Sequence, residues 1–229
     1  MPTVKRRLSR SKIGLPESPL WKKYAAMSKK LFAVYLGGRA PKCNTELHDV
    51  VFAVGDSIEA TYEQLMDKWF GDPLRLHLDS WVDLQVVDGH RITLHSVPGA
   101  QAKKLYFINL GAYLPGQFTE LHANAFAVAG DEHEVKQRAK GELLQGMQSV
   151  HTDDLFDIDD CLEVTEVDGH HIHLELTGES QPFAPSNGYH IIPREIVAAY
   201  AAKHKSRPPD SASSLTAPGA AAGGARAGG

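Results

Sequence analysis

Apolar and polar residues follow the same order twice along the chain, and this order predicts two copies of one unit. In the first copy, two apolar runs, Leu31–Leu36 and Val50–Val54, are each followed by glycine, which predicts buried strands. A helix is predicted next, because the apolar residues after Asp56 fall at helical spacing until Gly71 and Pro73. Burying its apolar face in a strand-rich unit requires packing on a sheet.

A hairpin is predicted to complete the first copy. Apolar residues alternate on both sides of Asp88-Gly89, over residues 81–87 and 91–95, and Asp-Gly favours a type I′ turn. At the start of the helix, Asp56 and Glu59 match a capping box. The predicted order is therefore strand, strand, helix, strand, strand.

The same order returns from residue 105, 74 positions later. Residues 31–54 and 105–128 carry the same amino acid at 11 of 24 aligned positions. The two predicted helices are alike in little beyond their cap residues, which are Asp131 and Glu134 in the second helix. Val167-Asp-Gly-His170 repeats Val87-Asp-Gly-His90 at a displacement of 80, so six extra residues are expected near 154–160. The fold class is predicted to be α+β, with two tandem ββαββ units in pseudo-twofold symmetry, antiparallel-rich sheets with helices packed on them, and a C-terminal helix.

The domain organisation follows from these boundaries and from composition. A basic, disordered extension, for which Met27 offers a second possible start, precedes the first repeat, and a Pro-, Ser-, Ala- and Gly-rich disordered tail ends the chain. The expected segments are 1–29 (extension), 30–95 (first repeat), 96–103 (linker), 104–176 (second repeat), 177–205 (loop and C-terminal helix) and 206–229 (tail).

Charge narrows the classes of partner. The net charge of -4 hides an acidic middle, because residues 31–205 hold 13 Lys or Arg against 26 Asp or Glu. A body this acidic repels phosphate backbones, so we expect no nucleic-acid binding by the folded core. No apolar stretch reaches the length of a membrane span. The two cysteines, Cys43 and Cys161, do not fall at matching positions of the repeat, so a disulfide framework is not expected and a reducing compartment is the default. A cytoplasmic protein without membrane partners is expected.

The most retained motif is Thr-Glu-Leu-His, at residues 45–48 and again at 119–122. Where the His begins a strand, the Glu two residues earlier points to the same side. The pairs Glu46–His48 and Glu120–His122 are therefore candidate catalytic residues, as general acids or anion clamps, and His48 and His122 are candidate metal ligands. A pseudo-twofold axis would bring both pairs into one site.

A purely structural role explains the same retention. The side chains would then satisfy backbone groups of a long loop, and the threonines and glycines would shape it. Either way, the ligand-binding candidates around the motif are Gly37, Gly38, Thr45, Gly111 and Thr119.

Further polar residues recur near the motif. His77 and Asp79 match His151 and Asp153 at the repeat distance, either lining the same cleft or forming polar pairs on a solvent face. His171 and His173 alternate on one strand face, where they form either a chelating pair or an exposed polar surface. The acidic residues 153–160 lack the spacing of a calcium loop and are expected to form a solvated insertion.

Together, Lys-Leu-Phe-Ala-Val-Tyr-Leu-Gly-Gly at 30–38, Thr-Glu-Leu-His-Asp at 45–49, Asp-Ser-Trp at 79–81 and Val-Val-Asp-Gly-His-Arg-Ile at 86–92 resemble a bacterial family catalogued as domain of unknown function 1543. The resemblance covers roughly residues 29–175. It implies a repeated domain, found in one or two copies per chain, and brings no activity, cofactor or catalytic residue. The second copy departs from the pattern at Asp-Ser-Trp.

Two functions from different classes fit the sequence. The first is binding or processing of a small molecule at a pseudo-symmetric Glu/His site, with both Thr-Glu-Leu-His loops facing a shared cleft. The second is a non-catalytic protein-interaction module in which these loops are only structural and the acidic surface contacts a basic partner. Self-association is compatible with both, and the sequence identifies no cofactor.

Overall fold

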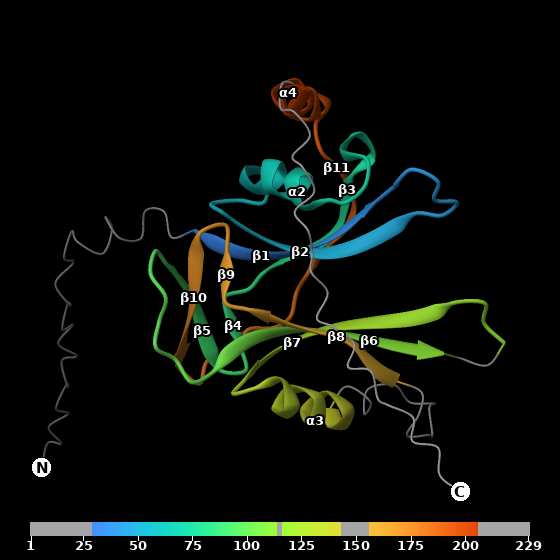
Figure 1. Ribbon diagram of the computed structural model, residues 1–229. Helices are drawn as coiled ribbons and strands as arrows, with labels where there is room; N and C mark the ends of the chain where they lie inside the picture. Colours follow the sequence, from blue (N-terminus) through green and yellow to red (C-terminus); the bar gives the residue numbers. More distant parts are fainter. Residues whose placement is uncertain (1–28, 114–115, 143–155, 206–229) are drawn as a thin grey trace, which may run out of the picture. The chain divides into compact units, whose positions relative to one another are not determined.

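The computed structural model describes residues 29–113, 116–142 and 156–205 (Figure 1). The described residues divide into two units, one up to Ile191 and one from Ile192. All the described strands belong to the first unit, and the second contains the helix α4 (Arg194–Lys205), which agrees with the predicted C-terminal helix. The fold is α+β with antiparallel sheets.

The first repeat builds most of one sheet, which we call the first sheet. β1 (Lys30–Gly38) pairs with β2 (Leu47–Gly55) on one side and β3 (His77–Asp83) on the other. A bulge lies between β1 and β3, because the partners of Tyr35 and Leu36 on β3 are Ser80 and Leu78, which leaves Asp79 as the extra residue. The sheet order is β11-β3-β1-β2.

The edge strand β11 (Ser186–Ile191) was not expected, because the sequence predicted a loop here from Pro182, Pro185 and Asn187-Gly188. It pairs with β3 with an irregular register between Asn187 and His190. This strand is recruited by the unpaired edge of β3, a long-range effect that local turn residues do not report.

The helix of the first repeat is shorter than predicted. It consists of a 3-10 turn, η1 (Glu59–Thr61), followed by α2 (Tyr62–Lys68), and neither has a side-chain cap, so the capping box at Asp56 and Glu59 does not form. The chain becomes extended at Trp69, which leaves Phe70 exposed. A second 3-10 turn, η2 (Pro73–Arg75), leads into β3.

The second repeat builds the second sheet, in the order β7-β6-β8. β6 (Lys104–Tyr113) lies between β7 (Glu120–Ala129) and β8 (Phe156–Val164). The helix α3 (Glu132–Glu142) is capped as predicted: Asp131 Oδ1 accepts from the Glu134 N–H at 2.8 Å, and Glu134 Oε2 accepts from the Gly130 N–H at 2.8 Å.

The two hairpins pair with each other and form a third sheet. β4 (Val86–Val87) and β5 (His90–His95) come from the first repeat, and β9 (Glu166–Val167) and β10 (His170–Leu176) come from the second. The sheet order β4-β5-β10-β9 places β5 antiparallel to β10. Both turns have the positive φ angles that a type I′ turn requires, 47° and 72° at Asp88-Gly89 and 50° and 73° at Asp168-Gly169.

Both repeats contribute to one apolar core, which we call the shared core. Its buried members include Leu31, Phe52 and Val54 from the first repeat, and Leu105, Phe107 and Val128 from the second. A separate core lies under α3, around Ile108 and Val135. Because the repeats share a core, their described residues form one folded body.

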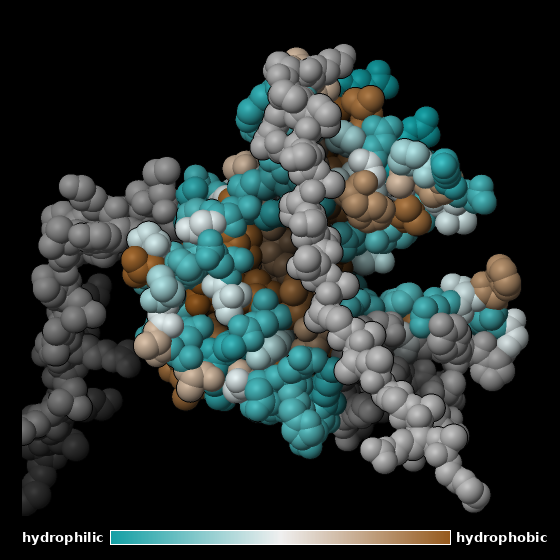
Figure 2. Space-filling view, in the orientation of Figure 1, coloured by the Kyte–Doolittle hydropathy of each residue, from teal (hydrophilic) through white to brown (hydrophobic). Residues whose placement is uncertain are grey.

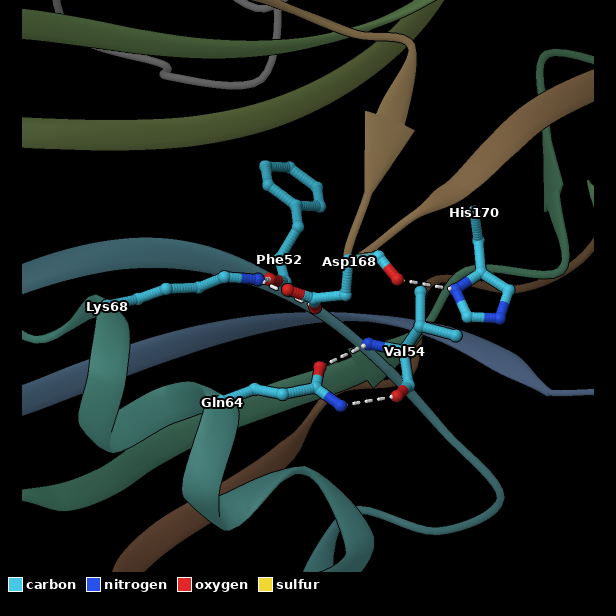
Figure 3. A network of polar contacts seen from close by, with 6 residues as sticks. All are labelled: Phe52, Val54, Gln64, Lys68, Asp168 and His170. Carbon is cyan, nitrogen blue, oxygen red and sulfur yellow. Dashed lines mark hydrogen bonds and ion pairs between the residues drawn. The ribbon is translucent and has the colours of Figure 1, made fainter. Parts of the chain in front are cut away.

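Each hairpin turn also reaches the helix of the other repeat, and we call these two contacts the clasps. Asp168 Oδ2 accepts from Lys68 Nζ of α2 at 2.7 Å, and Lys68 also donates to the Phe52 carbonyl (Figure 3). In the reverse direction, Asp88 Oδ2 accepts from Arg138 Nη2 of α3 at 2.8 Å and from the Val128 N–H at 2.8 Å. The repeats are therefore interlocked reciprocally.

Candidate functional site

The Glu–His pair of the first repeat lies on the face of the first sheet that carries the shared core. Side chains alternate along β2, so His48 points to the same face as the core residues Phe52 and Val54. The pairing of β1 with β2 and β3 sets Gly37 opposite both His48 and His77, and directly opposed residues share a face.

Four ionisable side chains meet on this face, and we call them the His–carboxylate cluster: Glu46, His48, His77 and Asp79. Asp79 lies between the two imidazoles, with Oδ1 3.3 Å from His77 Nε2 and Oδ2 3.3 Å from His48 Nε2. Glu46 does the same, with Oε1 3.4 Å from His77 Nε2 and Oε2 3.9 Å from His48 Nε2. The cluster is thus acceptor-rich, with two carboxylates facing two histidines.

The lack of a side chain at Gly37 leaves the space that the Asp79 and His77 side chains occupy. A Cβ atom at this position would lie 2.4 Å from Asp79 Oδ2 and 2.5 Å from His77 Nε2, closer than atoms can approach. The retained Leu-Gly step therefore serves the cluster. Gly38 is different, because its Cβ would meet Trp69 at 2.9 Å, on the helix side of the sheet.

His77 is the most enclosed member of the cluster. It is only 2% exposed, and its ring packs on Tyr189 of β11 with 4.1 Å between centroids. Within the described residues, neither of its ring nitrogens has a hydrogen-bond partner of good geometry, and the same holds for Asp79 Oδ2. Buried polar atoms in native proteins are nearly always hydrogen-bonded, so these atoms mark the cluster as a binding position.

Tyr35 adds an aromatic wall. Its ring stacks on His48, with 5.2 Å between centroids and 13° between planes. Burial raises the pKa of the Tyr35 hydroxyl, and the negative charge of Asp79 raises it further. The tyrosine side chain therefore lies in the negative field of the cluster.

The second repeat presents its own pair on the second sheet. His122 lies opposite Gly111, as His48 lies opposite Gly37, and its Nε2 is 3.6 Å from Glu120 Oε2. Asn109 takes the place of Tyr35 and donates to Asn124 Oδ1 at 2.7 Å. The pair is therefore retained, but its neighbours differ.

The matching of His77 and Asp79 with His151 and Asp153 needs correction. Gly37 pairs with His77, and its equivalent Gly111 pairs with Asp157. The bulge that isolates Asp79 recurs between Asn109 and Leu110, where it isolates Asp159. His151 and Asp153 lie outside the described residues, and Asp157 and Asp159 occupy the equivalent register positions. The 80-residue offset between equivalent positions of the two repeats thus begins before β8. The residues predicted as a solvated acidic insertion include the first part of this strand.

A cleft of about 280 Å³ lies between the two sheets beside the His–carboxylate cluster. Tyr35 and Val50 line it from the first sheet, and His122, Asn124 and Phe126 line it from the second. Apolar residues are visible in the hollow between the sheets in Figure 2. His122 of the second Thr-Glu-Leu-His motif lines this cleft, and His48 of the first motif stacks on Tyr35, which also lines it.

The remaining sequence candidates lie apart. Thr45 is exposed, and the Thr119 hydroxyl donates to the Glu120 carbonyl at 3.0 Å. His171 Nδ1 is 3.5 Å from Glu166, whereas His173 Nε2 bonds the Val97 carbonyl at 2.9 Å, so these two histidines have different partners. Across the described ranges, no group of three or more His, Cys, Asp or Glu side chains is arranged to hold a metal ion.

Sequence reasoning missed the two aromatic residues of the site, Tyr35 and Tyr189. Tyr35 looked like an ordinary member of a buried strand, and Tyr189 fell in a predicted loop. The available signal was period two along β1, which sets Tyr35 on the same face as Gly37.

The chain belongs to the family described as Domain of Unknown Function (DUF1543), whose model matches residues 43–94 and 117–174, one region in each repeat. The crystal structure of a protein, Il1583, from Idiomarina loihiensis is similar, with 40% sequence identity and a TM-score of 0.58. That similarity covers 72% of this chain and 99% of the other. No curated protein matches. Among the helices in the described residues, none has the length and apolar character needed to span a membrane.

Proposed function

We propose that the protein binds a small organic molecule in the cleft between its two sheets, with the polar end of the molecule at the His–carboxylate cluster. The observation that carries this proposal is His77, which is buried between Glu46 and Asp79. Among the described residues its Nδ1 makes no hydrogen bond, and its Nε2 lies 3.3 to 3.4 Å from the two carboxylates without a hydrogen bond of good geometry. A side chain held only for stability would have its polar atoms hydrogen-bonded, because an unpaired buried polar group costs about 1 to 3 kcal/mol.

The cleft supplies the rest of the site. Its volume of about 280 Å³ approaches the lower end of small-molecule sites, and its lining is apolar apart from a few polar groups, as such sites usually are. The cluster lies one step of two residues further along β1, from Tyr35 to Gly37, or about 7 Å at the usual rise of a strand. A ligand with an apolar body and one polar end therefore fits.

The test separates binding from stability. We expect a thermal-shift screen of small polar metabolites on the full chain to give ligands that stabilise the wild type but not His77→Phe. The phenylalanine keeps a ring at this position and removes both nitrogens. It loses the Nε2 contacts with Glu46 and Asp79 but also removes the unpaired Nδ1, so the free energy of unfolding should change little. If the screen finds no ligand and His77→Phe is also less stable than the wild type, His77 has a structural role.

A second pair of variants locates the ligand. Asn124→Trp should fill the cleft and abolish the shifts, whereas Leu176→Trp places the same bulk at an exposed position outside the cleft and should leave them unchanged. Ligands that still bind Asn124→Trp as tightly as the wild type would place their site elsewhere.

A further inference from the structure

We infer that the ligand of the His–carboxylate cluster is an organic ammonium compound. This inference rests on the proposed binding function and specifies the chemical class of the ligand. It starts from the balance of donors and acceptors in the cluster. Two carboxylates offer about four acceptor positions each, and the two Nε2 atoms that face them supply at most two donors.

The charges around the cluster do not correct this balance. In the described part of the chain, the ion pairs of Glu46 and Asp79 are all with His48 and His77, and none is with a lysine or arginine. Asp79 Oδ2 is buried, and although His48 Nε2 lies 3.3 Å away, the oxygen accepts no hydrogen bond within the described residues. An ammonium group brings a positive charge and three N–H donors, which is what these oxygens require.

Aromatic rings favour the same ligand. Tyr35 lines the cleft and feels the negative charge of Asp79, and Phe107, Phe126 and Phe183 line the cleft beyond it. Cations bind favourably over aromatic faces, and the apolar part of an amine buries surface against the same rings. A carboxylate ligand would instead face two carboxylates, which is repulsive.

The distance between the cluster and the cleft limits which amines can bind. The cluster and the cleft wall are separated by one two-residue step of β1, so the ammonium group and the apolar body should be joined by a short linker. A phenyl ring on a two-carbon amine has this form. Bulky or multiply charged amines fit less well, because the cleft is small and apolar.

The experiment is isothermal titration calorimetry on the full chain with three probes of similar size and different charge. These are 2-phenylethylammonium, 2-phenylethanol and 3-phenylpropanoate, each measured in buffer with a chelator. We expect saturable binding of the ammonium probe, weaker binding of the alcohol and none of the carboxylate. Asp79→Asn should weaken the ammonium probe about tenfold or more, because it removes a charge-assisted contact.

Asp49→Asn is the matched control. Asp49 is next to His48 on β2, but its side chain alternates to the opposite face and accepts from the Val50 N–H. This variant should bind the ammonium probe as the wild type does. Equal weakening by both variants would overturn the inference, since the effect would then come from the overall charge of the protein.

The outcomes distinguish this inference from the proposed function. Two results would refute the ammonium ligand but keep the proposed binding function. One is that the carboxylate or the alcohol probe binds best, and the other is that all His77-dependent ligands found in the screen lack an amine. If neither these probes nor any compound in the screen binds, both fail. Ammonium binding that is insensitive to Asp79→Asn also overturns the inference.

Discussion

The first repeat surrounds its Glu–His pair with more groups than the second. Around Glu46 and His48 are a buried histidine on β3 and a stacked tyrosine on β1. Around Glu120 and His122, the position of the tyrosine holds Asn109 and the register position of the histidine holds Asp157. Both repeats retain the motif, but the residues around it on the neighbouring strands differ.

The clasps, in contrast, are alike in the two repeats although the helix sequences around them differ. Lys68 and Arg138 are different residues on helices of different length, yet each binds the aspartate of the other repeat's hairpin turn. The contact that joins the repeats is kept in kind, although the helix sequences have diverged. The repeats thus share their assembly and differ in their candidate site.

The largest expected effect tests whether the repeats form one cooperative body. Phe52 packs edge to face on Phe107 and Phe126 of the other repeat, with centroids 6.1 and 6.2 Å away. Phe52→Ala should lower the free energy of unfolding by about 3 to 5 kcal/mol. In a Trp21→Phe background, tryptophan fluorescence reports Trp69 and Trp81 of the first repeat, and urea unfolding followed by fluorescence and by circular dichroism should shift equally.

The control for this change is Phe118→Ala, whose ring is fully exposed and whose loss should change stability by less than about 0.5 kcal/mol. A circular dichroism transition that keeps its wild-type midpoint in Phe52→Ala would mean that the second repeat unfolds by itself.

The two clasps should differ in strength. Asp88 accepts from a backbone N–H and from a guanidinium group, whereas Asp168 accepts from Lys68. Asparagine tolerates the positive φ of both turns, so Asp88→Asn and Asp168→Asn change the charge and little else. We expect Asp88→Asn to cost about 1.5 to 3 kcal/mol and Asp168→Asn about half of that, in urea unfolding. The reverse order would refute the ranking.

Gly37→Ala should disturb the site more than the fold. The added Cβ would collide with Asp79 and His77, so these side chains must move. We expect a loss of about 1 to 3 kcal/mol in unfolding free energy and weaker binding of the ammonium probe. Gly130→Ala, where the Cβ meets its nearest neighbour at an ordinary 3.4 Å, is the control. Unchanged binding in Gly37→Ala would separate Gly37 from the cluster.

Two tyrosines, one in each repeat, have effects that are absent at neutral pH and appear only above about pH 10. Burial first, then Glu163, raises the pKa of Tyr106 to about 12, and burial and Asp79 raise the pKa of Tyr35. An unfolded tyrosine ionises near pH 10, so stability falls as the pH rises from about 10 to 12, by about 1.4 kcal/mol per pH unit for Tyr106. Tyr106→Phe should remove its part of this loss.

Asp79→Asn refines this last prediction. It should lower the pKa of Tyr35 and leave that of Tyr106 unchanged, in an ultraviolet titration of tyrosinate compared with Tyr35→Phe and Tyr106→Phe. If Asp79→Asn leaves the pKa of Tyr35 where it was, the hydroxyl does not feel the charge of the cluster.

The local features of the fold were predictable, and the site was predictable in part. The sequence identified Glu46, His48, His77 and Asp79 separately, because each belongs to a His–carboxylate pair with two-residue spacing that recurs 74 positions later in the sequence. It did not bring them together, since the contact between β1 and β3 joins residues about 40 positions apart. The same gap explains the mistaken match of His151: the acidic residues of β8 looked solvated, and only pairing with β6 fixes their register.

The sequence by itself determined the duplication, the two Asp-Gly turns, the cap of α3 and the alternation that sets His48 on the face of Phe52. These depend on backbone preferences and side-chain periods that act over a few residues. The tertiary structure decided that β5 pairs with β10, that β11 completes the first sheet, and that the bulge at Asp79 gathers the cluster over Gly37. Those outcomes depend on which distant edges and apolar faces meet, and no local pattern specifies that choice.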